Sequence, residues 1–221
     1  MLTKKENEAV VDAFMTALMT GPYERISLRS IAEAAKVPLT KLVMHGATRA
    51  DLLEAFVDRV DAIVLDGDDP SMMEEPPRER LFDVMMRRYD ALLPHKLALI
   101  QLERDARRDP TLAAQVLRLS GKSLQRMAAS VGVDTDGPRG VIVMAGLASI
   151  HARVLRTWLK ESDEGQAKTM AELDRLLREA EKRIGDLDRF ARIVTEGDMS
   201  SLMWRPRRTA APSDDAAPEA A

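Results

Sequence analysis

A group of hydrogen-bond donors occupies residues 40–49, inside the segment LRSIAEAAKVPLTKLVMHGATRADLL at residues 28–53. Thr40 and Lys41 lie at the start of a short predicted helix, His45 and Arg49 follow it, and Arg29 lies one helix earlier. Such side chains contact base edges and phosphates when their helix enters the major groove of DNA. The segment has the outline of a DNA-reading helix-turn-helix, with donors at Arg29, Thr40, Lys41, His45 and Arg49.

Patterns for catalysis or metal binding are missing from the sequence. His45, His95 and His151 are far apart and lack a partner at metal-ligand spacing. The absence of cysteine excludes disulfides, thiolate metal sites and a cysteine nucleophile. No nucleophile elbow, phosphate-binding loop or zinc-protease motif occurs. We therefore expect no enzymatic activity, no metal and no cofactor.

Composition indicates a helical protein without bulk attraction to nucleic acid. The 221 residues carry a net charge of −3, so any contact with DNA must come from a local basic patch. Ala, Leu, Glu, Arg and Met dominate, and all favour helices. Residues 1–20 lack the apolar core of a signal peptide, and the apolar runs are too short to span a membrane. We expect an all-α protein in the cytoplasm.

Capping signals and apolar periodicity predict helices over residues 3–20, 27–35, 39–45 and 48–64. Three begin at side chains that can cap them, namely Thr3, Ser27 and Thr48. Two of these caps have an acidic partner three residues later, which is the capping-box pattern. The fourth helix has an amphipathic stripe formed by Leu52, Leu53, Phe56, Val57, Val60, Ile63 and Val64.

The N-terminal helices resemble the DNA-binding domain of the tetracycline-repressor (TetR) family. ISLRSIAEAAKV resembles the family pattern Ser/Thr-x-x-x-Ile-Ala-x-x-Ala-Gly-Val. TKLVMHGATRADLL resembles Thr-x-Tyr-x-His-Phe-x-Ser/Asn-Lys-x-x-Leu-Leu, and the likeness covers residues 8–60. The resemblance implies a helix-turn-helix that binds double-stranded DNA. It places Thr40 and Lys41 toward base edges, and His45 and Arg49 at phosphates.

Three residues depart from the family pattern. Val43 replaces a tyrosine whose hydroxyl reaches a phosphate, and Gly46 replaces an aromatic residue that packs the DNA-reading helix. Lys36 replaces the turn glycine, which predicts a positive φ at a cost of about 1 kcal/mol. Two interpretations therefore remain, a domain that binds DNA and a helical layer that has kept only the shape.

Helices also fill the remainder of the chain. They are predicted over residues 78–93, 95–107, 111–130, 139–160 and 167–184. The predicted domains are a helix-turn-helix domain at 1–65, an acidic and proline-bearing linker at 66–79, a ligand-binding and dimerisation domain at 80–204 and a disordered tail at 205–221.

Two sets of residues on these helices are candidates for binding. Soft, apolar side chains suit a pocket for an apolar small molecule or lipid, and the candidates are Met85, Met86, Tyr89, Met127, Met144 and Trp158. Apolar stripes on residues 139–160 and 167–184 predict a homodimer through Leu147, Ile150, Val154, Leu155, Leu173 and Leu177.

The C-terminal part is similar to the branch of this fold that contains the ubiquinone-biosynthesis lipid-binding proteins. RVLRTWLKESDEGQAKTMAELDRLL has a Trp, a short polar loop and a Thr-Met helix, features that recur in that branch. The similarity covers about residues 78–180. It implies binding of an isoprenoid lipid and of membranes in place of DNA.

The sequence thus favours a ligand-responsive TetR-family transcriptional regulator that binds DNA as a homodimer. The alternative is a lipid-binding accessory protein of ubiquinone biosynthesis with the same fold. Residues 186–204 distinguish the two, because their apolar residues and Trp204 precede a group of arginines. That pattern suits either a last helix packed on the protein or a helix lying on a membrane surface.

Overall fold

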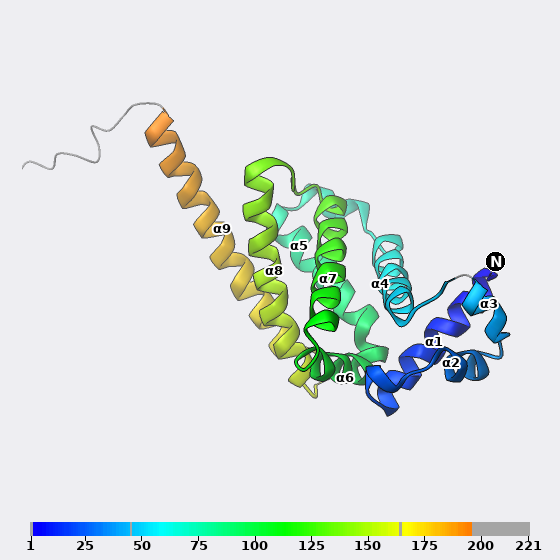
Figure 1. The fold of residues 1–221 in the computed structure, drawn as a ribbon. Coiled ribbons are helices and arrows are strands. Elements are labelled where there is room, and N and C mark those ends of the chain that lie inside the picture. Colours follow the sequence, from blue (N-terminus) through cyan, green and yellow to red (C-terminus); the bar gives the residue numbers. More distant parts are fainter. Residues whose placement is uncertain (1, 45, 164, 196–221) are drawn as a thin grey trace, which may run out of the picture. The chain divides into compact units, whose positions relative to one another are not determined.

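The computed structural model describes residues 2–44, 46–163 and 165–195, and every regular element within them is helical (Figure 1). The elements are α1 (Lys4–Thr20), the 3-10 turn η1 (Tyr23–Arg25), α2 (Leu28–Ala35), α3 (Leu39–Met44), α4 (Arg49–Asp66), η2 (Pro70–Glu74), α5 (Pro77–Leu92), η3 (Leu93–His95), α6 (Lys96–Ala106), α7 (Pro110–Ser130), α8 (Gly137–Lys160) and α9 (Ala167–Thr195). The described residues up to 181 form one compact unit, and residues 182–195 belong to a second. The expected all-α fold is confirmed.

The predicted capping side chains begin their helices. The Glu6 N–H donates to Thr3 Oγ1 at 3.2 Å, and the Thr3 N–H donates back to Glu6 Oε2 at 2.8 Å. Thr48 and Asp51 form the same reciprocal pair at the start of α4. Ser27 accepts the Ser30 N–H at the start of α2. Each cap is worth about 1 kcal/mol, so these helix starts are fixed by local sequence.

Left-handed residues end the two helices of the turn motif. Lys36 has φ 55° and ψ 38°, as the sequence predicts. The Val37 N–H then donates to the Ala32 carbonyl at 3.0 Å, which satisfies one of the last free carbonyls of α2. Gly46, with φ 64°, follows α3 in the same way. A glycine at this position avoids the strain that a Cβ would cause.

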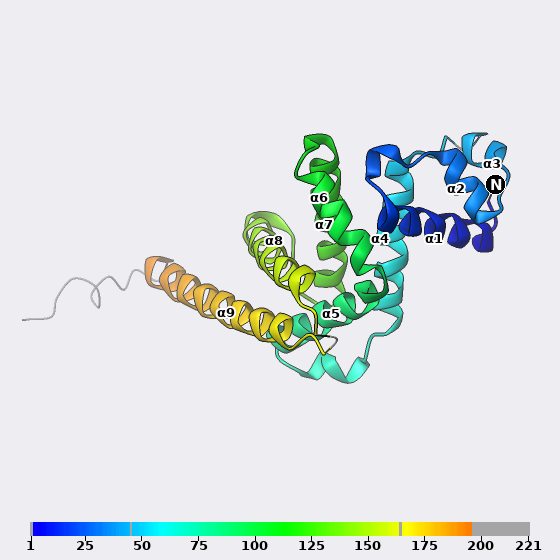
Figure 2. The same cartoon turned by 90° about the horizontal axis from the view of Figure 1, so that it is seen from below.

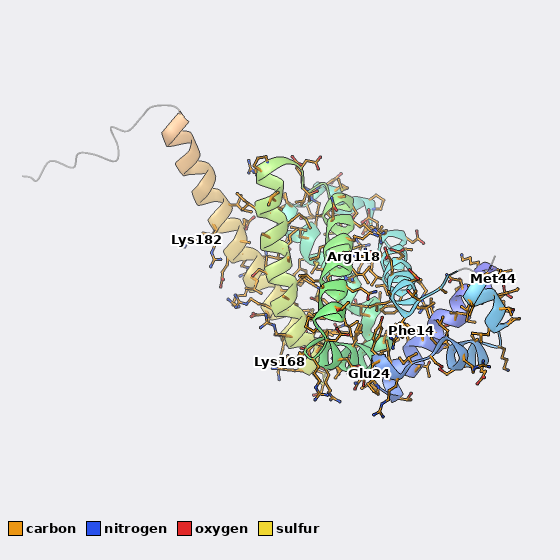
Figure 3. The ribbon with its side chains drawn as sticks, viewed as in Figure 1. Phe14, Glu24, Met44, Arg118, Lys168 and Lys182 are labelled. Carbon is orange, nitrogen blue, oxygen red and sulfur yellow. The ribbon has the colours of Figure 1, made fainter. Side chains whose placement is uncertain are left out.

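The head is formed by α1, η1, α2 and α3. Its core contains Val10, Phe14 and Leu18 of α1, Ile31 of α2 and Leu42 of α3, each at most 1% exposed. Figure 3 shows Phe14 within this helical layer. α1 also packs against α4 and α6, so the head shares one continuous core with the remaining helices.

The body is formed by α4 to α8. α4 packs against α5 and α7, and α7 packs against α8 (Figures 1 and 2). Acidic residues of α4 bind basic residues of α7 at the outer edge of this contact. Glu54 lies 2.8 Å from Arg118 and 2.6 Å from Lys122, and Asp58 lies 2.6 Å from Arg126. Figure 3 labels Arg118 on α7.

Helix α9 is longer than the sequence predicts. The helix expected to end at residue 184 continues through Gly185 to Thr195. One glycine costs a helix about 1 kcal/mol but does not end it without a further breaking signal. The membrane-surface prediction for 186–204 and the predicted tail fall on side chains and residues outside the described part of the chain.

Among the described residues, α8 is the one helix with the length and hydropathy to cross a membrane. The expectation that every apolar run is too short to span a membrane therefore does not hold for α8. A helix from the core of a globular protein meets the same criteria. α8 packs against α6 and α7 of the body, so its composition fits a helix of that bundle.

Candidate nucleic-acid interface and ligand cavity

Helix α3 has one buried side and one open side. Leu42 is fully buried beneath it, whereas Val43 is 55% and Met44 83% exposed. Thr40 is exposed as well, and Figure 3 shows Met44 at the outer end of the head. α3 therefore offers Thr40, Val43 and Met44 to a partner. The predicted contact His45 lies outside the described residues.

Lys41 forms an ion pair within the head. Its Nζ lies 2.6 Å from Glu6 Oε1, and the Glu6 carboxylate also accepts the Thr3 N–H. The hydrogen bond from Lys41, followed by that from Thr3, lowers the pKa of Glu6 to about 2. Glu6 is thus ionised at neutral pH and holds the Lys41 ammonium beside the start of α1. Lys41 is therefore already bound to a carboxylate within the head before any contact with DNA.

Arg49 holds the turn η1 in place. Its Nη1 donates to the carbonyls of Tyr23 at 2.7 Å and Glu24 at 2.6 Å, and its guanidinium lies 4.9 Å from the centre of the Tyr23 ring. From the other side, Asp105 of α6 accepts the Tyr23 N–H at 2.8 Å. Arg49, predicted to contact phosphate, therefore has a structural role in which it joins α4 to η1.

Charge near α3 differs from that of the whole chain. Residues 25–49 contain one acid, Glu33, and five basic residues, Arg25, Arg29, Lys36, Lys41 and Arg49. Arg29 is exposed on α2. The chain as a whole carries a net charge of −3. The basic segment that DNA binding would require is therefore present at the turn motif.

The body contains a cavity of about 140 Å³. Residues of all five body helices line it, and eleven of the fifteen are apolar. The four polar lining residues are Arg88 of α5, Glu103 of α6, Ser120 of α7 and His151 of α8. The cavity is thus an apolar space with a few polar groups, which is the usual composition of a small-molecule site.

The six residues predicted for a pocket do not line this cavity, and their role in binding a ligand stays a prediction. Met85, Met127 and Trp158 are buried in the core, and Met86 and Met144 are half-buried. Tyr89 lies directly behind the wall, because its hydroxyl is 3.2 Å from His151 Nδ1. Helical periodicity identifies inward residues but does not reveal which of them border an empty space.

A buried ionic network, which sequence reasoning missed, joins three body helices. Asp61 of α4 accepts hydrogen bonds from Arg88 Nη1, Ser123 Oγ and Arg126 Nη1. Asp61 is 1% and Arg88 5% exposed. Burial lowers the pKa of Arg88, and the nearby Asp61 opposes that shift. The available signal was a charged residue within the apolar stripe of residues 52–64.

The predicted dimer residues face the protein's own core, and their role in a dimer stays a prediction. Val154 and Leu173 are fully buried, Leu147, Ile150 and Leu177 are at most 7% exposed, and Leu155 is half-buried. The opposite side of α8 is open, with Val141 68% and Ile142 61% exposed. This α8 face continues along the helix through the exposed small residues Ala145, Gly146, Ser149 and Ala152.

The loop between α8 and α9 explains the residues that resemble the lipid-binding branch. Trp158 Nε1 donates to Gln166 Oε1 at 2.8 Å. Glu161 accepts the N–H groups of Lys168 at 2.7 Å and Thr169 at 3.0 Å, and so caps α9. These contacts give the motif a structural role. The lipid-binding alternative stays a prediction from the sequence.

Comparison with family models finds no match, and comparison with curated proteins finds none either. Among solved structures, a TetR transcriptional regulator from Nitrosomonas europaea is similar with a TM-score of 0.64 and 18% identity, over 79% of this chain and 97% of that one. A TetR transcriptional regulator from Rhodococcus sp. RHA1 is similar with a TM-score of 0.52 and 15% identity, over 79% and 94%. The chain has the fold of the TetR transcriptional regulators.

Proposed function

We propose that this protein is a transcriptional regulator that binds double-stranded DNA through α3, acts as a homodimer and responds to a small molecule. The main support for this proposal is the exposed side of α3, which packs on the rest of the head through the buried Leu42. The basic residues of 25–49 flank this exposed side. In a helix-turn-helix, the second helix enters the major groove. α3 is that helix here, and Thr40 is its exposed hydrogen-bonding residue.

Binding to DNA would combine positioning and reading contacts. Arg29 is exposed and can bind phosphate without giving up a partner that the structure shows. Lys41 becomes available when a phosphate or base acceptor replaces Glu6. Phosphate contacts supply affinity, whereas contacts to base edges supply sequence preference. Thr40, at the start of α3, supplies the preference in this proposal.

The α8 face fits an interface between two copies of the chain. Val141 and Ile142 are large, apolar and mostly exposed, which is costly unless a partner covers them. The small residues beyond them allow a second helix to approach closely. A two-fold symmetric dimer presents the same face twice, and it would place two heads on one DNA site.

Helix α6 is a physical connection between the cavity and the head. Leu102, Glu103 and Ala106 of α6 line the cavity, while Asp105 of the same helix holds the Tyr23 N–H of η1. A ligand that prefers one position of α6 therefore shifts the position of η1. The ligand would change the affinity for DNA to the extent that it binds the two positions of α6 with different affinities.

A gel-shift experiment with the DNA upstream of the protein's own gene tests this function. Thr40→Ala should weaken binding by about 1 kcal/mol or more if Thr40 contacts a base. Thr111→Ala, an exposed threonine at the start of α7, is the matched control and should bind as the wild type does. Equal weakening by both variants, or no complex with the wild type, contradicts the proposal.

A further inference from the structure

One of the four polar residues that line the cavity is a buried arginine with an unused donor. Arg88 lines the cavity and is 5% exposed. Its Nη1 donates to Asp61, but its buried Nε has no hydrogen-bond partner among the residues that the structure describes. Buried N–H groups in proteins are nearly always paired, because an unpaired one has lost its bond to water. The edge of the guanidinium formed by Nε and Nη2 is the edge that Asp61 leaves open.

A second donor belongs to the lining of the same cavity. His151 lines the cavity, and its Nδ1 is 3.2 Å from the Tyr89 hydroxyl. Burial, together with the charge of Arg88, lowers the pKa of His151 to about 3, so the ring is neutral. Burial raises the pKa of Tyr89, which therefore keeps its proton. We assign this hydroxyl as the donor and His151 Nδ1, its partner in the structure, as the acceptor. The ring proton then lies on Nε2, which makes that nitrogen a donor.

The hydrogen-bond donors of the lining, and not its net charge, favour an anionic ligand, because Asp61 already pairs with Arg88. Ser120 adds a hydroxyl, and the one carboxylate in the lining belongs to Glu103. Glu103 is half-buried and accepts a hydrogen bond from Arg107 Nε at 2.7 Å, so its charge is partly offset. An arginine edge of two parallel N–H groups matches the two oxygens of a carboxylate.

We propose that the cavity binds a small apolar molecule that carries a carboxylate. The carboxylate lies against Arg88 and His151, and the hydrocarbon part lies among Leu102, Leu119 and Leu155. The cavity volume of about 140 Å³ is close to the ~150 Å³ of apolar cavities that hold benzene. A ligand the size of benzoate therefore fits. This inference rests on the proposed function, because the acid is the molecule to which the regulator would respond.

The test compares three probes that share a ring and differ in the attached group. Benzoate, toluene and benzylamine are titrated into the full-length protein in the absence of DNA, with calorimetry and thermal unfolding as readouts. Charge-assisted hydrogen bonds predict that benzoate binds about tenfold or more tightly than toluene, and that benzylamine does not bind. Equal affinities, tighter binding of benzylamine, or no binding by any probe would overturn the proposal.

Two arginine variants separate ligand binding from the ionic network. Arg88→Lys keeps a cation beside Asp61 but removes the two-pronged donor edge, so the preference for benzoate over toluene should fall to less than about threefold. Arg126→Lys is the matched control, because Arg126 binds the same carboxylate but does not line the cavity. It should keep the preference. If either variant fails to fold, the probe series with the wild type still decides.

The outcome is independent of DNA binding. A protein that binds its DNA and no acid overturns this inference but leaves the proposed regulator intact. A protein that binds benzoate through Arg88 and no DNA supports the inference and removes the proposed function.

Discussion

The Lys41 ammonium of α3 lies 2.6 Å from the Glu6 carboxylate of α1. The same carboxylate accepts the Thr3 N–H and so completes the capping box of α1. Glu6 is therefore fixed in position by its capping role while it holds the one lysine of α3. A phosphate of DNA would have to share that lysine with the carboxylate or displace the carboxylate.

Replacing Glu6 with Gln should strengthen DNA binding. The amide oxygen still accepts the Thr3 N–H, but the negative charge that holds Lys41 is gone. We expect affinity for DNA to rise about threefold and the salt dependence to steepen by about 0.9 as one more phosphate is contacted. Glu8→Gln removes an equal charge from an exposed site on α1 and should change binding less. Equal effects of the two variants, measured by fluorescence anisotropy, argue against a specific hold on Lys41.

Replacing Arg49 with Ala should act on stability rather than on phosphate contact. The variant loses two hydrogen bonds to η1 and the contact with the Tyr23 ring. We expect the free energy of unfolding in urea to fall by about 1–3 kcal/mol, with an unchanged salt slope of DNA binding. Arg29→Ala is the counterpart, because Arg29 is exposed and is proposed to contact phosphate. This variant should keep its stability, and the salt slope of its DNA binding should be lower by about 0.9. A lower slope for Arg49→Ala restores the phosphate role expected from the sequence.

A charge on the α8 face should break the dimer without unfolding the chain. Ala145 is exposed, so Ala145→Glu is tolerated by the monomer but buries a charge between two copies. Light scattering should show a dimer for the wild type and a monomer for Ala145→Glu, with equal helical content. Ala114→Glu, an exposed position on α7, should stay dimeric. A monomeric wild type at micromolar concentration contradicts this interface.

The buried His151 should make the fold sensitive to mild acid. Its pKa in the folded protein is about 3, below the value of about 6.5 in an unfolded chain. Between these values the unfolded state binds the extra proton, so stability is lost as the pH falls through this window. From pH 7 to pH 5 the loss is about 2 kcal/mol from this residue. The free energy of unfolding in urea should depend less on pH in His151→Phe than in the wild type. If the two proteins lose the same stability between pH 7 and pH 5, His151 is not the source of the pH dependence.

Local signals made most of the fold predictable. The caps at Thr3, Ser27 and Thr48 and the left-handed Lys36 depend on residues within a few positions of each other, and all four were predicted. The helices of the body were located by their apolar period, with ends correct to within about two residues. The exception is α9, which was predicted to end at residue 184 and continues to Thr195.

The sites depended on contacts between distant segments, and sequence reasoning located them less well. Lys41 with Glu6, and Arg49 with Tyr23, are separated by 35 and 26 residues, so neither contact has a local signal. Periodicity also misplaced two positions on α4, where Ile63 is 55% exposed and Asp61 is buried. Leu147 and its neighbours were correctly judged apolar, but periodicity does not say whether such a face meets the same chain or a second copy.

Selection from a random library of DNA duplexes tests the central claim most directly. The full-length protein is mixed with the library at about 0.15 M salt, and the duplexes that stay bound are sequenced. The affinity for each enriched sequence is then compared with the affinity for a scrambled version of it. Two heads related by a two-fold axis predict a two-fold symmetric sequence, bound about a thousandfold or more tightly than its scrambled version. Failure to enrich any sequence, with equal and weak binding of all duplexes, would contradict a regulator that reads DNA through α3.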